Sequence, residues 1–333
     1  MQLALIIIIS RIFTLMTHIP LIRDGFSFSE QLLAMAVSSA AAAVLIIPAL
    51  IFYGRYDTGI IDCAYGRNRL WGIIAAAVYL LYLVLACAAD VSQFSAFIGC
   101  RFDFGAKEWV IALFLMIVCM YCAYCGAEGI CRSGGAVMVI FLIMAAFMVC
   151  GSCEKMSAEH IRCTISAGNA VTAVIDDLAG STELIVLVLM GKFTRDRYRC
   201  GAYLSLAGRL LIAAGITLSV ILVLGDYAYI CGYPFLDTGS AAGIKFLQRI
   251  DAVYMIVWSL AAVLTISLKI FLAADILRTI CPECFPVITI FSAAVYILYL
   301  LGIIGNSILM LILMILGAFI VPLCQLPKRS GSV

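Results

Sequence analysis

The sequence predicts an all-α, polytopic membrane protein of about ten transmembrane helices, and three observations lead to this prediction. Of the 333 residues, 65% are hydrophobic and only 12% are charged, whereas soluble domains carry roughly 25% charged residues. The mean hydropathy is high, at +1.16. The apolar residues also gather in runs of about 20, the length that a helix needs to cross the hydrocarbon core of a bilayer. We therefore expect lipid around most of the chain.

Ten apolar runs are candidate spans, and each is expected to be helical because lipid offers no partner to an unsatisfied backbone group. They lie near 3–22, 32–54, 70–98, 108–126, 134–151, 172–191, 203–225, 250–274, 286–303 and 306–324. The first run contains Arg11 and leads into further spans, so we interpret it as a span and not as a cleavable signal peptide. The whole chain, 1–333, is thus expected to form one transmembrane domain.

The distribution of Lys and Arg predicts the orientation. With ten spans, both termini lie on one side, whose loops hold eleven basic residues against seven in the opposite loops. The densest cluster, at 192–199, is on the richer side. Cytoplasmic loops carry the excess of basic residues, so both termini are expected in the cytoplasm. The net charge of +2 gives no reason to expect a nucleic-acid partner.

The two halves of the chain have a similar outline. The third span of each half, near 70–98 and near 250–274, is the long one. Five spans is an odd number, so the second half would run inverted relative to the first, which is the layout of many secondary transporters. The pattern therefore predicts a 5+5 inverted repeat, with a first repeat over about 3–151 and a second over about 172–324.

Ionisable residues inside spans are energetically costly, so each is a candidate functional residue. They occur in four of the predicted spans: Arg11 in the first, Asp90 in the third, Asp176, Asp177 and Glu183 in the sixth, and Lys269 in the eighth. Lys269 must pair, reach the interface or lose its proton, and Glu183 and Asp90 are its candidate partners. The pair could be purely structural, or the ammonium could replace a coupling cation or carry a proton. Arg209, nearer the cytoplasmic end of the seventh span, is expected to extend toward the interface.

Span one carries a polar stripe. Ser10, Thr14 and Thr17 follow one another at i, i+4 and i+7, which places them on one helical face. Two interpretations stay open: the hydroxyls bond neighbouring helices, or a partly unwound helix presents them to a ligand.

Span six contains Gly180 and Ser181 within an otherwise continuous apolar run. A Gly-Ser pair is a common place for a helix to kink, and an opened helix exposes N–H groups that suit a ligand carboxylate. Asp176 and Glu183 are seven residues apart and are expected on one face. The alternative is that Asp176 and Asp177 lie at the outer interface, whereas Glu183 is deeper.

No catalytic motif is present: the sequence has no HExxH, no P-loop and no Gly-x-Ser-x-Gly. We therefore expect neither an enzyme nor a bound cofactor. The 15 cysteines mostly occur singly in apolar runs, as packing residues do. Cys281 and Cys284 form one CxxC, which without a second pair is a weak metal or redox signal, and no metal site is predicted.

Several stretches resemble the B subunits of spore germinant receptors, the permease-like GerAB type of the amino acid–polyamine–organocation transporter superfamily. The strongest is 233–277, which is similar to the family's outer loop and eighth span. The matching positions are Arg249, Asp251 and Lys269 there, Glu183 in STELIVLVL, and Arg11 and Pro20 in span one. The chain departs from the family where Thr14 and Thr17 replace the usual glycine of span one.

The resemblance implies a leucine-transporter-type fold and the sensing of small nutrients, usually amino acids, in the inner membrane of a dormant spore. It also implies A and C subunits as partners. We expect the nutrient to bind between spans one, three, six and eight. The candidate contacts are Thr14, Thr17, Asp90, Gly180, Ser181, Thr182 and Thr265, with Glu183 and Lys269 as ion-pairing or proton-carrying residues. The alternative function is a proton-coupled amino acid permease in which Glu183 or Lys269 titrates.

Overall fold

The structure is a computed structural model that describes residues 2–17, 27–101, 107–161, 167–194, 198–241, 250–282, 286–303 and 306–326. In these ranges the chain is helical, with short connections. The first half contains α1 (Gln2–Thr17), α3 (Phe28–Leu45), α4 (Ile47–Tyr53), α5 (Ile60–Arg67), α6 (Arg69–Arg101), α7 (Glu108–Tyr124) and α8 (Gly126–Ser152). The second contains α9 (Ala167–Ala179), α10 (Glu183–Thr194), α11 (Tyr198–Leu224), α12 (Pro234–Ala241), α13 (Ile250–Ile280), α14 (Val287–Leu300), α15 (Ser307–Ile315) and α16 (Val321–Gln325).

Within the described residues, each predicted span falls mainly on helix. Six helical segments in this part of the chain are long and apolar enough to cross a membrane: 28–53, 69–100, 126–155, 198–229, 253–280 and 307–325. Three shorter apolar helices lie at 4–15, 108–124 and 287–300. The sixth predicted span is divided into α9 and α10. The chain is therefore a polytopic helical membrane protein, as the composition predicts.

Local sequence explains several helix boundaries. Ser27 and Glu30 form a reciprocal capping box that begins α3. Pro48 stands in the first turn of α4, where a missing N–H does no harm. Between α15 and α16 lies a π-helical turn, Leu316–Ile320. There the Tyr79 hydroxyl donates to the Gly317 carbonyl at 2.7 Å, so a backbone group of the irregular turn has a partner inside the bundle.

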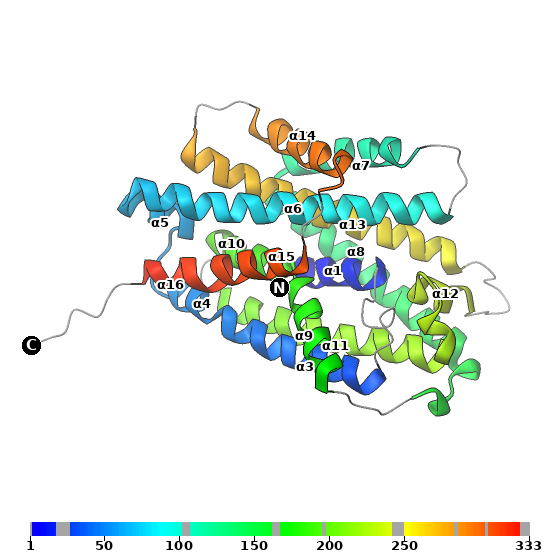
Figure 1. Ribbon diagram of the computed structural model, residues 1–333. Coiled ribbons are helices and arrows are strands. Elements are labelled where there is room, and N and C mark those ends of the chain that lie inside the picture. The colour runs from blue at the N-terminus through cyan, green and yellow to red at the C-terminus, as the bar shows by residue number, and fades with distance from the viewer. Residues whose placement is uncertain are drawn as a thin grey trace, which may run out of the picture.

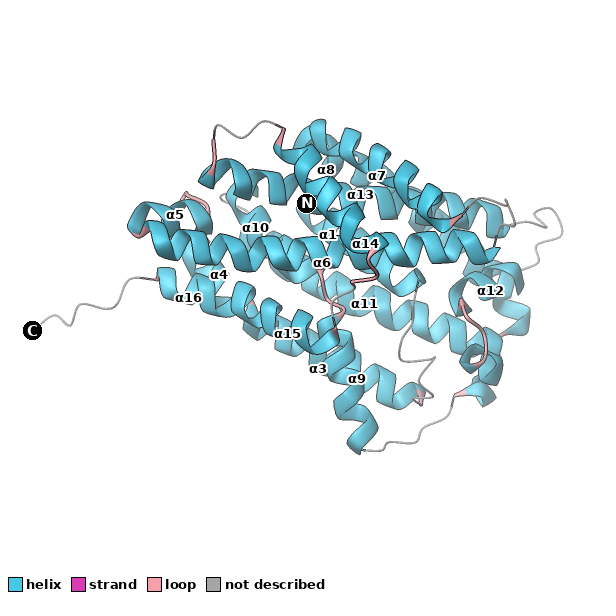
Figure 2. Ribbon diagram, turned by 45° about the horizontal axis from the view of Figure 1, so that its top comes forward, coloured by secondary structure: helices cyan, strands magenta, loops and turns pink. Residues whose placement is uncertain are grey.

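The long helices run side by side along one direction (Figure 1), and the same arrangement is visible after rotation in Figure 2. Helices α6 and α13 are the longest among the described residues, with 33 and 31 residues, as expected for the third span of each half. Helix α13 packs against α1, α6, α7 and α8, and α1 also packs against α10 and α11. The interior of the bundle is thus formed mainly by α1, α6, α10 and α13.

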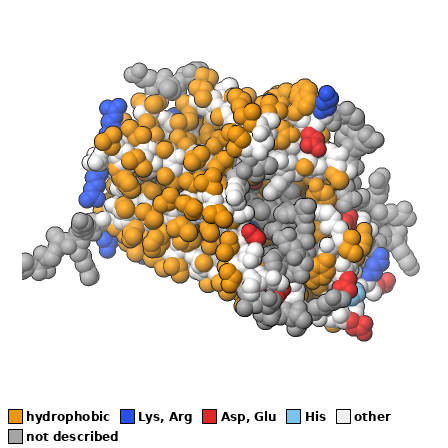
Figure 3. Space-filling view, in the orientation of Figure 1, with side chains coloured by type: hydrophobic (Ala, Val, Ile, Leu, Met, Phe, Trp, Pro, Cys, Tyr) orange, Lys and Arg blue, Asp and Glu red, His pale blue; other side chains and the backbone are white. Residues whose placement is uncertain are grey.

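The surface has the pattern of a protein in lipid. Large apolar side chains are exposed along the helices, such as Leu211 (73%), Tyr121 (70%) and Phe114 (66%). Figure 3 shows a broad hydrophobic face, with Lys and Arg at the end where α5 and α16 lie and also at the opposite end. The acidic side chains visible in that view lie in the other half of the molecule. Exposure of so much apolar surface is favourable only where lipid covers it.

Candidate functional site

The sixth predicted span is broken at the Gly-Ser pair. Helix α9 ends at Ala179, α10 begins at Glu183, and Gly180, Ser181 and Thr182 connect them. Every residue of the following stretch, 181–191, is buried, so the break lies inside the protein. Irregular backbone at membrane depth is tolerated where protein or a cavity surrounds it, and such breaks often mark binding sites in transporters.

The expectation that the break offers free N–H groups is wrong for its three residues. Gly180 N donates to the Asp176 carbonyl at 2.9 Å, Ser181 N to Leu178 at 3.0 Å, and Thr182 N to Gly180 at 3.0 Å. The Ser181 hydroxyl adds a bond to the Asp177 carbonyl at 2.6 Å. The connection satisfies its own amides in tight turns, so a ligand carboxylate needs other donors. The side chains around the break provide them.

A buried ion pair joins the two longest helices next to the break. Lys269 Nζ on α13 lies 2.6 Å from Asp90 Oδ2 on α6 and donates to Thr182 Oγ1 at 3.0 Å. Lys269 is fully buried, and the side chain of Asp90 is 7% exposed. Of the two carboxylates considered from the sequence, Asp90 and not Glu183 bonds the ammonium. Thr182 thereby links the broken span to the ion pair.

A second charged group connects five helices on the other side of the break. Asp177 accepts from Arg11 on α1, from Ser38 on α3 and from Arg209 Nη2 on α11, the last at 3.0 Å. Glu183 lies 3.3 Å from Arg209 Nη1 and 4.0 Å from Arg11 Nε. All four charged side chains are at most 4% exposed. Each arginine therefore lies between two carboxylates.

Three positions inferred from the sequence are wrong here: the expected interfacial position of Arg209, the alternative interfacial position of Asp177, and the common face of Asp176 and Glu183. Arg209 does not reach the interface, because it is only 2% exposed and is paired inside the bundle. Asp177 does not lie at the outer interface, because it is 4% exposed and paired with two arginines. Asp176, by contrast, is half-buried. It does not share a continuous helical face with Glu183, because α9 ends between them.

The two groups together form a charged layer, which we define as Arg11, Asp90, Asp177, Glu183, Arg209 and Lys269. It contains three cations and three anions, all buried, so its formal net charge is zero. Burying unpaired ions is very unfavourable, whereas paired and hydrogen-bonded ions are tolerated. Every charge has an opposite charge within 4.0 Å, although neither carboxylate oxygen of Glu183 has a hydrogen bond among the described residues. A ligand that adds net charge to the layer would disturb its neutrality.

Buried hydroxyls near the layer have no hydrogen-bond partner among the described residues. They are Ser10 Oγ on α1, Tyr82 Oη on α6 and Thr265 Oγ1 on α13. Thr265 precedes Lys269 by four residues, which places both on one face of α13. Tyr82 is fully buried. Buried polar groups without partners are rare, and each one calls for a water or a ligand as an explanation.

The described part of span one is a regular helix. Helix α1 is continuous from Gln2 to Thr17, so it does not unwind in this range. The Thr14 hydroxyl donates to the Ser10 carbonyl of its own helix at 3.1 Å. The side chains of Thr17, His18 and Pro20 lie outside the residues whose side chains are described, as do Arg249 and Asp251. Sequence reasoning missed Ser38 and Tyr82, since neither residue type is unusual in a membrane helix.

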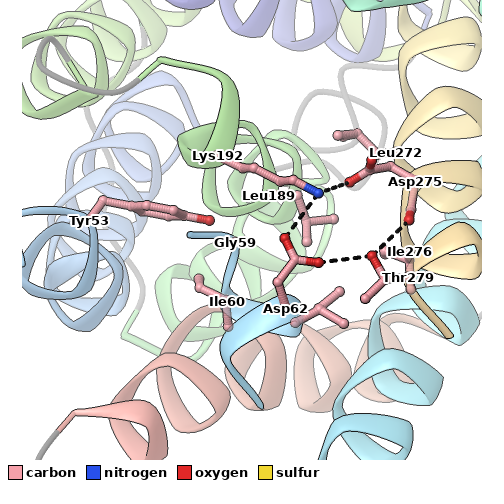
Figure 4. A pocket seen from close by; sticks show the side chains of 11 residues that line it. Tyr53, Gly59, Ile60, Asp62, Leu189, Lys192, Leu272, Asp275, Ile276 and Thr279 are labelled. Atoms are coloured by element: carbon pink, nitrogen blue, oxygen red, sulfur yellow. Dashed lines mark hydrogen bonds and ion pairs between the residues drawn. The ribbon is translucent and has the colours of Figure 1, made fainter. Parts of the chain in front are cut away.

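A second polar cluster lies at the end of the bundle near α5 (Figure 4). Lys192 on α10 lies 3.0 Å from Asp62 Oδ2 on α5 and 3.1 Å from Asp275 Oδ2 on α13. Thr279 donates to Asp62 Oδ1 at 2.9 Å. These four residues, which we call the inner cluster, line a small pocket and are partly exposed, with Lys192 at 31%. A Cβ on Gly59, the residue before α5, would lie 2.7 Å from the Asp62 carboxylate and 3.0 Å from Lys192 Cδ, so glycine leaves room for the Asp62–Lys192 pair.

The remaining titratable residues show no metal site. Among the residues that the structure describes, no three His, Cys, Asp or Glu side chains are grouped to hold a metal ion. Cys281 is exposed, and Cys284 lies outside the described residues.

Residues 66–307 match a family model described as "Spore germination protein". The match covers well over half of the chain and includes Asp90, the break at 180–182 and Lys269. Among curated proteins, none shows significant sequence similarity to the chain.

Proposed function

The chain belongs to the spore germination protein family, and from this premise we propose that it is the permease-like, nutrient-binding subunit of a spore germinant receptor. The observation that supports this role most strongly is the buried, neutral charged layer at the break between α9 and α10. A stable soluble or structural bundle has no need of six buried ions, because apolar residues of similar volume are often as stabilising. Ionisable groups at membrane depth are typical of ligand or ion sites.

In this proposal a small nutrient, such as an amino acid, binds at the charged layer between α1, α6, α10 and α13. The residues proposed to form the site are Thr14, Thr17, Asp90, Gly180, Ser181, Thr182, Glu183, Thr265 and Lys269. Binding shifts an equilibrium between two conformations, which requires that the nutrient binds one of them more tightly. A- and C-type subunits of the receptor would respond to that shift.

We also propose ten spans in a 5+5 inverted repeat. The matched lengths of α6 and α13 support this arrangement, as does the break in the first span of the second half. Both termini are proposed to face the cytoplasm of the spore. The larger number of Lys and Arg in the loops on that side, eleven against seven, supports that orientation.

The alternative is a proton-coupled amino acid permease, which the buried Lys269 and Glu183 favour because either could titrate during transport. Two measurements separate the functions. Spores that lack the gene should fail to germinate with a nutrient that triggers wild-type spores, and the restored gene should return the response. The purified protein in proteoliposomes should show no uptake of the same labelled nutrient. Uptake together with normal germination of the deleted spores would establish the permease instead.

A further inference from the structure

Within the charged layer, Asp90 and Lys269 are the two charged residues that can most easily exchange their partner for a ligand. Arg11 and Arg209 each lie between two carboxylates, so their interactions are spread over several partners. Lys269, in contrast, has one carboxylate and one hydroxyl as partners, at 2.6 and 3.0 Å. Asp90 in turn has Lys269 as the one ion-pair partner found among the described residues.

We propose that this pair opens to receive a zwitterionic α-amino acid, whose carboxylate binds Lys269 and whose ammonium binds Asp90. This inference rests on the proposed function and specifies its ligand chemistry. An amino acid carries one positive and one negative charge, so it replaces one ion pair with two and leaves the net charge of the layer at zero. An amine or a carboxylic acid adds an uncompensated charge to a buried site, which is strongly unfavourable.

Neighbouring hydroxyls suit the carboxylate end of such a ligand. Thr182 holds the Lys269 ammonium from the side of the break, so the cation stays in position when Asp90 moves away. Thr265 lies one turn before Lys269, is 2% exposed and has an unpartnered hydroxyl. That hydroxyl is placed to donate to the second carboxylate oxygen. The unpaired Thr265 hydroxyl would thus gain a partner on binding, which favours the bound state.

Opening the ion pair also connects nutrient binding with a conformational change of the helices. Asp90 and Lys269 directly connect α6 with α13, and Thr182 connects both to α10. A ligand that binds between the two charges separates the Asp90 and Lys269 side chains and so breaks this direct connection of α6 with α13. The conformational change then follows from the ligand's own contacts and needs no additional switch.

The test compares ligands that differ in one charge, with the full-length protein in lipid nanodiscs. The probes are L-alanine with ethylamine and propionate, and L-leucine with isopentylamine and 4-methylpentanoate, each titrated by calorimetry. The amino acid is expected to bind at least about 100-fold more tightly than either one-charge analogue. Equal affinity of an analogue, or binding of glucose without binding of either amino acid, would overturn the inference. If glucose binds and germination still depends on the gene, the proposed receptor function remains supported and only the inference about amino acids fails.

A double variant provides the second arm. Asp90→Asn with Lys269→Met removes both charges together, so no charge is left buried alone, and the variant is expected to fold but to bind L-alanine and L-leucine at least about 100-fold more weakly. Glu128→Gln, which breaks the exposed Arg132–Glu128 pair, serves as the control with unchanged binding. Wild-type affinity in the double variant would contradict the inference. If that variant does not fold, the comparison of one-charge analogues on the wild-type protein still decides the question.

Discussion

Asp90 and Lys269 lie at corresponding positions along the two longest helices. Asp90 is 21 residues from the start of α6, Lys269 is 19 residues from the start of α13, and their charged atoms are 2.6 Å apart. In an inverted repeat these helices are equivalent elements that run in opposite directions. The ion pair would then connect the two repeats near their common axis, where transporters of this architecture bind substrate.

Loss of the Lys269 charge should destabilise the protein. Lys269→Met leaves the Asp90 carboxylate buried with no ion-pair partner, and breaking a buried pair in this way costs about 3–5 kcal/mol. The midpoint of thermal denaturation in detergent should fall clearly, and germination should be lost. Lys269→Arg keeps the charge, but the planar guanidinium does not match the position of an ammonium, so it should also lose the response. A Lys269→Met protein of normal stability and response would contradict the assigned role.

Loss of the Arg209 charge should destabilise the protein as much as loss of the Lys269 charge, although Arg209 lies in a different helix. Arg209→Met leaves Asp177 and Glu183 with only Arg11 as a cation and places a net negative charge in the interior. We expect a loss of about 3–5 kcal/mol in the free energy of unfolding. Arg132→Met, at an exposed ion pair, is the matched control and should be close to neutral. Similar denaturation midpoints for the two variants would show that Arg209 is not part of a buried network.

Local signals in the sequence predicted some of this site. The Gly180–Ser181 pair was sufficient to predict the helix break, because backbone preferences act over a few neighbouring residues. The burial of Lys269 was also expected, since a lysine in an apolar run needs a partner wherever the other helices lie. The break is therefore at the predicted position, even though its amides bond within the turn.

Which buried side chains pair with one another could not be predicted from such local signals. Whether Arg209 meets Asp177 or water depends on how α11 packs against α1 and α3, and hydropathy contains no information on that packing. The same applies to Ser38, which bonds Asp177 across the α3–α9 contact. Tyr82 gave no signal, because a single tyrosine in an apolar helix is common and only its burial without a partner makes it notable.

The inner cluster should hold α5 against α10 and α13. Lys192→Gln removes the cation between Asp62 and Asp275, so the two carboxylates then repel each other and α5 loses its attachment. Hydrogen–deuterium exchange of the peptide covering 60–67 should become faster, by up to about tenfold for a loss near 1.4 kcal/mol. Lys192→Arg should restore slow exchange. Equal exchange rates in the wild-type and Gln proteins would show that the cluster does not hold α5.

The orientation can be checked with two native cysteines at opposite ends of the bundle. Cys100, at the end of α6, and Cys200, in the first turn of α11, are both exposed. In right-side-out vesicles, a membrane-impermeant maleimide should label a variant whose remaining cysteine is Cys100. A variant that keeps Cys200 instead should react only after the membrane is opened. The reverse labelling pattern would place both termini outside.

The most direct test of nutrient binding at the broken span is the germination response of spores that carry Gly180→Val. A Cβ at this position would lie 3.3 Å from the Asp176 carbonyl, and the branched side chain of valine would shift the break next to Thr182. With normal amounts of the protein in the membrane, the nutrient concentration for half-maximal germination should rise at least about tenfold, or the response should vanish. Gly168→Val, at an exposed position of α9 where a Cβ meets nothing within 4 Å, is the control. An unchanged concentration in a stable Gly180→Val protein would place the nutrient site elsewhere and leave the break as a structural kink.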